Sequence, residues 1–159
     1  MRTASVFLLC SGVVLSSAGC SGNVNPHVAT RLNQDATVNG LPSNPMQGKV
    51  ITSWINKQDS TMSTMFGNEV AVGYARTNAA AQYPVGSTLS VVTWDQQEDP
   101  RWFGGNIPQK VKAIEFVTVT APGTYSYERF EGSPLKQVAG VDSKDREESL
   151  IGMRAAVMP

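Results

Sequence analysis

The sequence predicts an α+β domain in which helices flank an antiparallel β-sheet. Two observations support this class. Two predicted strands, the β-branched run at residues 110–120 and its partner at residues 125–130, are separated only by the turn sequence Ala121-Pro122-Gly123-Thr124, and so short a connection joins antiparallel neighbours. Amphipathic segments with helix-capping residues occur before and after these strands, at residues 68–81 and from residue 142 onward. Strands joined by hairpins and covered by helices define an α+β domain.

The first elements of the domain follow from their apolar spacing. Residues 49–57 carry apolar side chains at 50, 51, 54 and 55, which favours a short amphipathic helix. Residues 60–67 alternate as a strand does. Asn68 is a suitable N-cap and Glu69 suits the first turn of a helix, which we expect to continue to about residue 81, before Pro84.

The later elements follow from β-branched runs and their breakers. Residues 89–94 predict a central strand, because they are rich in Val, Thr and Trp. Pro100 and the pair Gly104-Gly105 predict a loop after it. The strands 110–120 and 125–130 come next, and a final helix begins at Asp142 or Ser143.

The N-terminal part reads as an export and anchoring segment. Residues 1–19 combine one basic residue, a short apolar run and small residues before Cys20, which is typical of a signal peptide. The ending Ser17-Ala18-Gly19-Cys20 resembles a bacterial lipobox, so we expect Cys20 to be lipidated. An ordinary cleaved signal peptide that leaves a free cysteine is the alternative. Ser21 after the cysteine favours the outer membrane, with the protein facing the periplasm.

We expect residues 20–47 to form a flexible tether and residues 48–159 to form the globular domain. The tether is rich in Asn and Pro and has no sustained apolar period. A short turn of helix is expected near residues 30–35. The single histidine, His27, lies in this tether, so we expect no histidine-dependent catalysis and no zinc site in the domain. Thirteen basic side chains balance thirteen acidic ones, which gives no basis for nucleic-acid binding.

Residues 89–108 contain the candidate site, because aromatic and charged side chains gather at the end of a predicted strand. Such loops are positioned by a rigid scaffold and often carry function. The candidate residues for contact with a ligand or partner are Trp94, Glu98, Asp99, Arg101, Trp102 and Phe103. A structural interpretation is also open, in which an Arg/carboxylate network fixes the loop and Trp102 caps the core.

Three short motifs in order resemble the cytochrome P-460 family. They are a Gly67-Asn68 helix start with Ala71, the turn Tyr83-Pro84-Val85-Gly86, and an apolar strand ending in Trp94. The likeness extends over residues 48–159. Residues 94–108 and the closing residues 154–159 look like a lipoprotein branch of that family. The resemblance implies an antiparallel sheet flanked by helices, homodimers, and, in well-known members, a c-type haem that acts on hydroxylamine or nitric oxide.

The haem attachment motif of that family, Cys-x-x-Cys-His, is missing here. The sequence has no Cys after Cys20 and no His after His27, so covalent haem and imidazole ligation are not expected. We therefore expect no cofactor. Noncovalent haem remains an alternative, with ligands that could come from Tyr or Met. These candidates are Met62, Met65, Tyr74, Tyr83 and Met153.

Three function classes follow. The first is a noncatalytic binding or interaction module on a lipid anchor, which would contact a small ligand or an envelope protein. The second is a haem-binding relative that acts in redox or nitric oxide chemistry. The third is a hydrolase that uses two of Asp95, Glu98 and Asp99 as acid and base, although adjacent carboxylates beside an Arg are usually a solvated network. We expect the first class, and no enzyme activity.

Overall fold

The computed structural model describes residues 30–32, 34, 36–77, 82–139 and 143–156, and these form an α+β domain. Its six-stranded antiparallel sheet has the sequential order β1-β2-β3-β4-β5-β6. The predicted class is therefore confirmed. The elements are β1 (Lys49–Asn56), β2 (Thr61–Gly67), α2 (Glu69–Arg76), β3 (Thr88–Glu98), β4 (Asn106–Ala121), β5 (Thr124–Glu131), β6 (Lys136–Gln137) and α3 (Ser143–Gly152).

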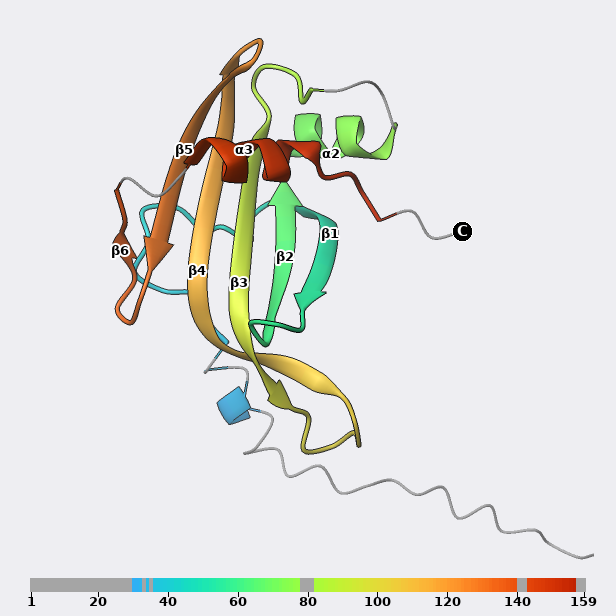
Figure 1. The fold of residues 1–159 in the computed structure, drawn as a ribbon, viewed down its shortest axis with the longest axis vertical. Coiled ribbons are helices and arrows are strands. Elements are labelled where there is room, and N and C mark those ends of the chain that lie inside the picture. The colour runs from blue at the N-terminus through green and yellow to red at the C-terminus, as the bar shows by residue number, and fades with distance from the viewer. Residues whose placement is uncertain (1–29, 33, 35, 78–81, 140–142, 157–159) are drawn as a thin grey trace, which may run out of the picture.

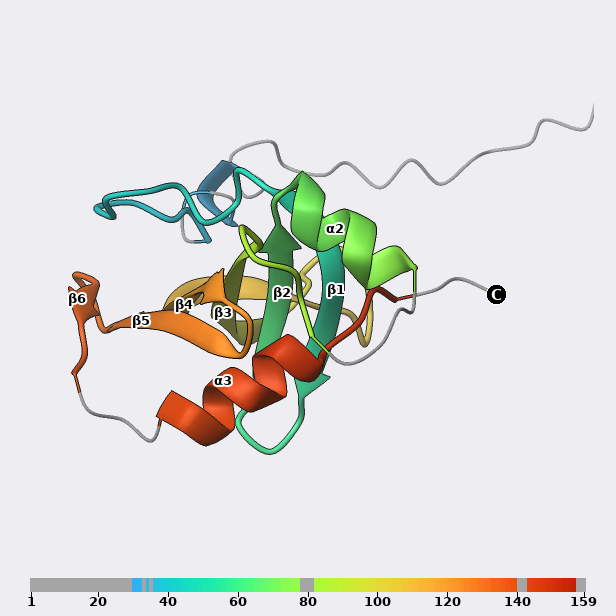
Figure 2. The ribbon, with the colours of Figure 1, turned by 90° about the horizontal axis from the view of Figure 1, so that it is seen from above.

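The two faces of the sheet are covered by different parts of the chain. Helix α3 crosses one face, and the segment 36–47 lies on the other (Figures 1 and 2). Beneath the helices, a cluster of buried side chains joins the sheet to α2 and α3: Ile51, Met65, Ala71, Val72, Ala75, Tyr83, Leu89, Val91, Val117, Val119, Leu150 and Ile151. We call this the helix face. The opposite face, the loop face, buries Val92, Trp94, Ile114 and Phe130.

Helix α2 begins as the sequence predicts. The Asn68 side-chain oxygen accepts a hydrogen bond from the Ala71 N–H at 3.0 Å, which satisfies one of the free donors of the first turn. The helix ends at Arg76 with Thr77 as C-cap, earlier than expected. Residues 78–81 of the predicted helix lie outside the described residues.

The prediction of a helix at residues 49–57 is wrong, because these residues form strand β1. A β-bulge between Val50 and Thr52 shifts the alternation of the strand, so that Ile51 and Trp54 both contact the helix-face cluster. Val50 and Ile55 are exposed. The apolar spacing that suggested a helix therefore comes from an irregular strand.

Strand β3 does not stop at Trp94, as the sequence suggests, but continues to Glu98. Beyond Asp95, β3 pairs only with the start of β4, so the two strands form a hairpin that extends past the rest of the sheet. Pro108 is tolerated in β4 because β5 pairs with β4 only from Ala113 onward. Register shifts on both sides of Trp94 accompany the bend that is visible at the base of this hairpin (Figure 1). The two-residue strand β6 was not predicted.

The folded domain includes residues that the sequence assigns to the tether. Ala36, Val38 and Leu41 pack against the loop-face cluster. Trp94 Nε1 donates to the Ala36 carbonyl at 2.9 Å, and the Ser90 hydroxyl donates to the Pro45 carbonyl. The packed part of the chain therefore begins before the predicted boundary at residue 48. Residues 30, 31, 32 and 34 are helical, as expected for a short turn there.

The segment expected to be a signal peptide, together with Cys20 and His27, lies outside the described residues. Among the helices that the structure describes, none is long and apolar enough to cross a membrane.

Substitution of glycine by alanine should have opposite effects on stability at two positions. A Cβ at Gly48 would lie 2.5 Å from the carbonyl oxygen of Gly67, and backbone cannot yield as a side chain can. Gly48→Ala should therefore lower the free energy of unfolding by about 1–3 kcal/mol. A Cβ at Gly73, inside α2, would meet no neighbouring atom within 4 Å. Gly73→Ala should raise stability by about 0.5–1 kcal/mol, because alanine is the better helix former. Urea titrations of both variants test this pair, and equal effects would contradict it.

Candidate functional site

The hairpin that extends from β3 and β4 carries most of the candidate residues. We call residues 95–112 the hairpin arm. Its turn is closed by three backbone hydrogen bonds: Asp99 N to Gly105 O at 2.8 Å, Trp102 N to Asp99 O at 3.2 Å, and Gly105 N to Trp102 O at 2.9 Å. Gly104 has a φ of 75°, a conformation that glycine adopts without strain. The turn is thus a compact, internally bonded structure.

Asp99 and Arg101 form a local ion pair that organises this turn. The Asp99 carboxylate accepts from the Arg101 backbone N–H at 2.9 Å and from the Arg101 side chain at 3.1 Å and 3.3 Å. These hydrogen bonds, together with the positive charge of Arg101, hold the pKa of Asp99 below its usual range. The part of the structural interpretation in which an Arg/carboxylate pair fixes the loop is confirmed.

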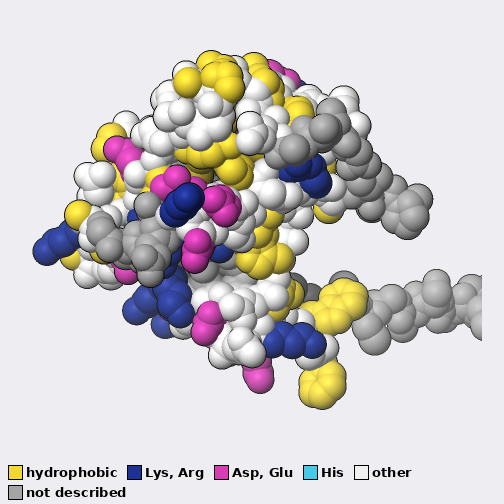
Figure 3. Space-filling model, turned by 45° about the horizontal axis from the view of Figure 1, so that its top comes forward, with side chains coloured by type: hydrophobic (Ala, Val, Ile, Leu, Met, Phe, Trp, Pro, Cys, Tyr) yellow, Lys and Arg dark blue, Asp and Glu magenta, His cyan; other side chains and the backbone are white. Residues whose placement is uncertain are grey.

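Trp102 and Phe103 point away from the protein. Trp102 is 75% exposed and Phe103 is fully exposed. Figure 3 shows hydrophobic side chains standing clear of the body at one end of the molecule. The interpretation in which Trp102 caps the core is therefore wrong. An internally bonded turn instead presents two adjacent aromatic side chains to the surroundings.

Trp94 is separated from this aromatic pair. It is only 7% exposed, packs in the loop-face cluster and donates its indole N–H to the Ala36 carbonyl. Its burial predicts a structural role rather than the contact role that the sequence suggested. Glu98 is exposed at the end of β3, opposite Asn106. Asp95 lies 3.7 Å from Lys112 Nζ, so two of the three candidate carboxylates are in ion pairs.

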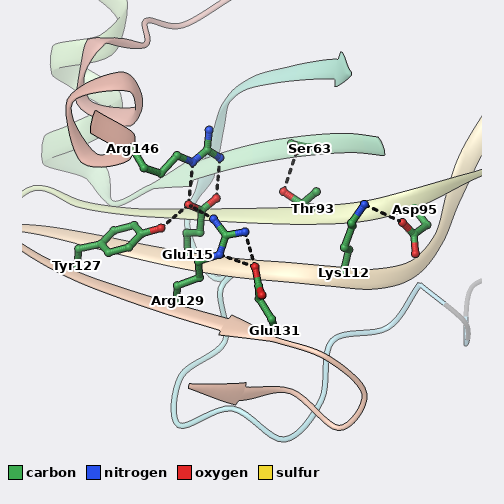
Figure 4. A network of polar contacts seen from close by, with 9 residues as sticks. All are labelled: Ser63, Thr93, Asp95, Lys112, Glu115, Tyr127, Arg129, Glu131 and Arg146. Carbon is green, nitrogen blue, oxygen red and sulfur yellow. Dashed lines mark hydrogen bonds and ion pairs between the residues drawn. The ribbon is translucent and has the colours of Figure 1, made fainter. Parts of the chain in front are cut away.

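The structure also contains a buried charge network that was not predicted from the sequence (Figure 4). Glu115 on β4 is only 2% exposed. Its carboxylate accepts from Arg146 of α3 through two hydrogen bonds of 2.8 Å and 2.7 Å, and from the Tyr127 hydroxyl at 2.6 Å. Arg129 lies 3.6 Å from the same carboxylate and also pairs with Glu131. This network joins α3 to strands β4 and β5 on the helix face.

A cavity of about 300 Å³ opens beside this network. It is lined by hydroxyl groups and by charges of both signs, among them Ser63, Thr93, Lys112, Arg129 and Arg146. Ser63 and Thr93 share a hydrogen bond of 2.8 Å. Because both carboxylate oxygens of Glu115 already accept from arginine, this group is a structural anion and not a free base.

The protonation of Glu115 follows from two opposing causes. Burial alone would raise its pKa, but hydrogen bonds from Arg146 and Tyr127 and the charges of Arg146 and Arg129 outweigh burial and lower it. Burial and the hydrogen bond to Glu115 raise the pKa of Tyr127 to about 12. The phenol therefore stays protonated and keeps donating at neutral pH.

The lowered pKa of Glu115 predicts that the protein loses stability in acid. The folded pKa of Glu115 lies below its unfolded value, so its contribution is complete above the unfolded pKa and is lost as pH falls through the folded one. Urea unfolding of the wild type and of Glu115→Gln at several pH values from 7 to about 2 measures this contribution. We expect the difference in unfolding free energy between the two proteins to shrink below the usual Glu pKa. A difference that stays constant down to the lowest pH would contradict the assignment.

The candidate haem ligands lie mostly among core side chains. Met65 and Tyr83 are buried in the helix-face cluster, and Tyr74 and Met153 pack against it, whereas Met62 contacts the loop-face cluster. The Tyr83 hydroxyl donates to the Met153 carbonyl at 3.0 Å. The part of the chain that the structure describes contains no group of three or more His, Cys, Asp or Glu side chains that could hold a metal ion.

No protein-family model matches the chain, and no curated protein matches it.

Proposed function

We propose that the protein is a noncatalytic binding module that makes contact through the tip of its hairpin arm. The exposed, adjacent Trp102 and Phe103 are the observation that carries this proposal. Aromatic side chains contribute most to binding when they become buried in a complex. The hydrogen bonds of the turn and the Asp99–Arg101 pair fix the backbone that carries both rings before binding, which lowers the entropy cost of association.

The surroundings of the carboxylates favour a binding function over hydrolysis. An acid/base pair needs carboxylates that are free to exchange protons with a substrate. Asp99 is held by Arg101, Asp95 lies beside Lys112, and Glu115 is fully engaged by arginine and tyrosine. The arm thus offers an apolar contact and fixed charges that orient it.

The same proposal includes the expected cell location and scaffold. The protein would be lipidated at Cys20 and held at the outer membrane, facing the periplasm. The domain would be a cytochrome P-460-like scaffold without covalent haem, a view that the antiparallel sheet and helices α2 and α3 support. An absorption spectrum of the protein isolated from its envelope tests the cofactor part, and a strong Soret band would contradict it.

A photocrosslinking experiment tests the contact. Phe103 is replaced by p-benzoylphenylalanine, which preserves the aromatic ring, and intact cells are irradiated. Val85 is the control position, because it is also exposed but lies in a different loop. We expect adducts from position 103 in clear excess over position 85. Equal, background-level labelling at both positions would overturn the proposal.

A further inference from the structure

The tip of the hairpin arm, formed by Trp102 and Phe103, has the features of a membrane contact. We propose that this tip inserts into the interface of the lipid bilayer that carries the protein's own acyl anchor, an inference that rests on the proposed function. Tryptophan is enriched at membrane interfaces, where its apolar ring meets lipid and its N–H stays near water. The tip presents one such ring beside a fully exposed phenylalanine.

The position of the first described residues supports this occupant. Residues 30–32 and 34 and the end of the hairpin arm lie toward the same end of the molecule, away from α2 and α3 (Figure 1). The chain from Cys20 to Thr30 can span at most about 35 Å, at about 3.5 Å per residue when fully extended. An acyl group on Cys20 would therefore keep this end of the domain close to the bilayer.

The size of the tip favours lipid over a protein partner. A stable protein–protein interface buries about 1,200–2,000 Å² in total, whereas one aromatic side chain buries about 150–250 Å². Two rings alone are too small for such an interface. They are large enough for a second attachment of a protein that is already anchored, because the anchor keeps the local concentration of lipid high.

The charges of the arm predict which lipids the tip accepts. Arg101 is paired with Asp99, and Lys112 lies beside Asp95, so each of these two basic side chains is balanced by an acidic neighbour. Attraction to anionic headgroups needs a surplus of basic side chains. We therefore expect contact with zwitterionic vesicles that is insensitive to salt.

Fluorescence of the lipidated protein in vesicles tests the inference. The processed, acylated chain is reconstituted in phosphatidylcholine vesicles whose acyl chains are brominated, since bromine quenches tryptophan that reaches the hydrocarbon. The matched control is Trp102→Phe, which keeps an aromatic ring but removes the reporter. We expect bromolipid to quench the wild type and to have little effect on the variant, because Trp94 is buried and Trp54 packs against the helix-face cluster.

Acrylamide quenching in the same vesicles distinguishes the other outcomes. If Trp102 is unaffected by bromolipid and remains open to acrylamide, the membrane contact is overturned. If Trp102 is shielded from both quenchers, the tip is covered by a second copy or another protein, which also overturns it. In either of these outcomes, crosslinks from position 103 to a protein would still support the proposed function. Loss of those crosslinks would contradict both the proposed function and the membrane contact.

Discussion

Glu115→Gln should lower the free energy of unfolding by about 3 kcal/mol, a change that urea titration at pH 7 would measure. The substitution keeps the size of the side chain and removes only its charge. Arg146 and Arg129 then face an uncharged amide, whose NH₂ group is itself a donor. We expect a value at the low end of the range for a broken buried pair, because these arginine side chains keep 31% and 24% of their surface exposed.

The matched control for this prediction is Glu131→Gln. Glu131 also pairs with Arg129, but its side chain is 40% exposed, so water can replace the lost interaction. Its removal should cost less than about 1 kcal/mol. Combining Glu115→Gln with Arg146→Met should cost less than the sum of the two single changes, because each single change strands the other partner. Strict additivity would contradict the network.

The network explains how α3 is fixed on the sheet. Leu150 and Ile151 bury the end of the helix in the helix-face cluster, and Arg146, one turn earlier, reaches Glu115. Hydrophobic contacts alone are not directional, whereas the two hydrogen bonds from Arg146 define one position of the helix. Loss of Glu115 should therefore loosen α3 before it unfolds the sheet.

Much of the fold follows from local sequence signals. Strand β5 and the turn before it were predicted because turn residues around Pro122 and Gly123 follow a long β-branched strand, and Asn68 marked the start of α2. Strand β1 was not recognised, because its bulge at Ile51 places apolar residues at helix-like spacing. The packing of Ala36 and Leu41 on the loop face was also missed, since isolated apolar residues in a polar segment give no periodic signal.

The site was predictable only in part. The exposure of Trp102 and Phe103 could not be read from the sequence, because aromatic residues after a strand more often cover a core. One signal for the charge network was present. Glu115 occupies a core position in the alternation of β4 between Ala113 and Val117, and a buried carboxylate requires partners. Its partner Arg146 lies 31 residues away, so only the fold brings the two together.

Trp94→Ala and Trp102→Ala separate structure from contact within one hairpin. Trp94 is buried, fills the loop-face cluster and binds the Ala36 carbonyl through its indole N–H. Its truncation leaves a cavity and releases the segment before β1, so the unfolding free energy should fall by about 3–5 kcal/mol. Trp102 projects from the tip, and its truncation should change stability by less than about 0.5 kcal/mol.

Binding should show the reverse order, provided that it is measured on folded protein. Trp102→Ala should abolish the excess crosslinking from position 103, while a milder change at the core position, Trp94→Phe, should preserve it. Trp94→Phe keeps an aromatic ring and loses the hydrogen bond to Ala36, which should cost only about 1–2 kcal/mol. If the Trp102→Ala variant instead unfolded at urea concentrations at which the wild type remains folded, the tip would be part of the core. The contact surface would then have to lie elsewhere. If Trp94→Phe abolished crosslinking in a folded protein, the contact surface would extend onto the loop face.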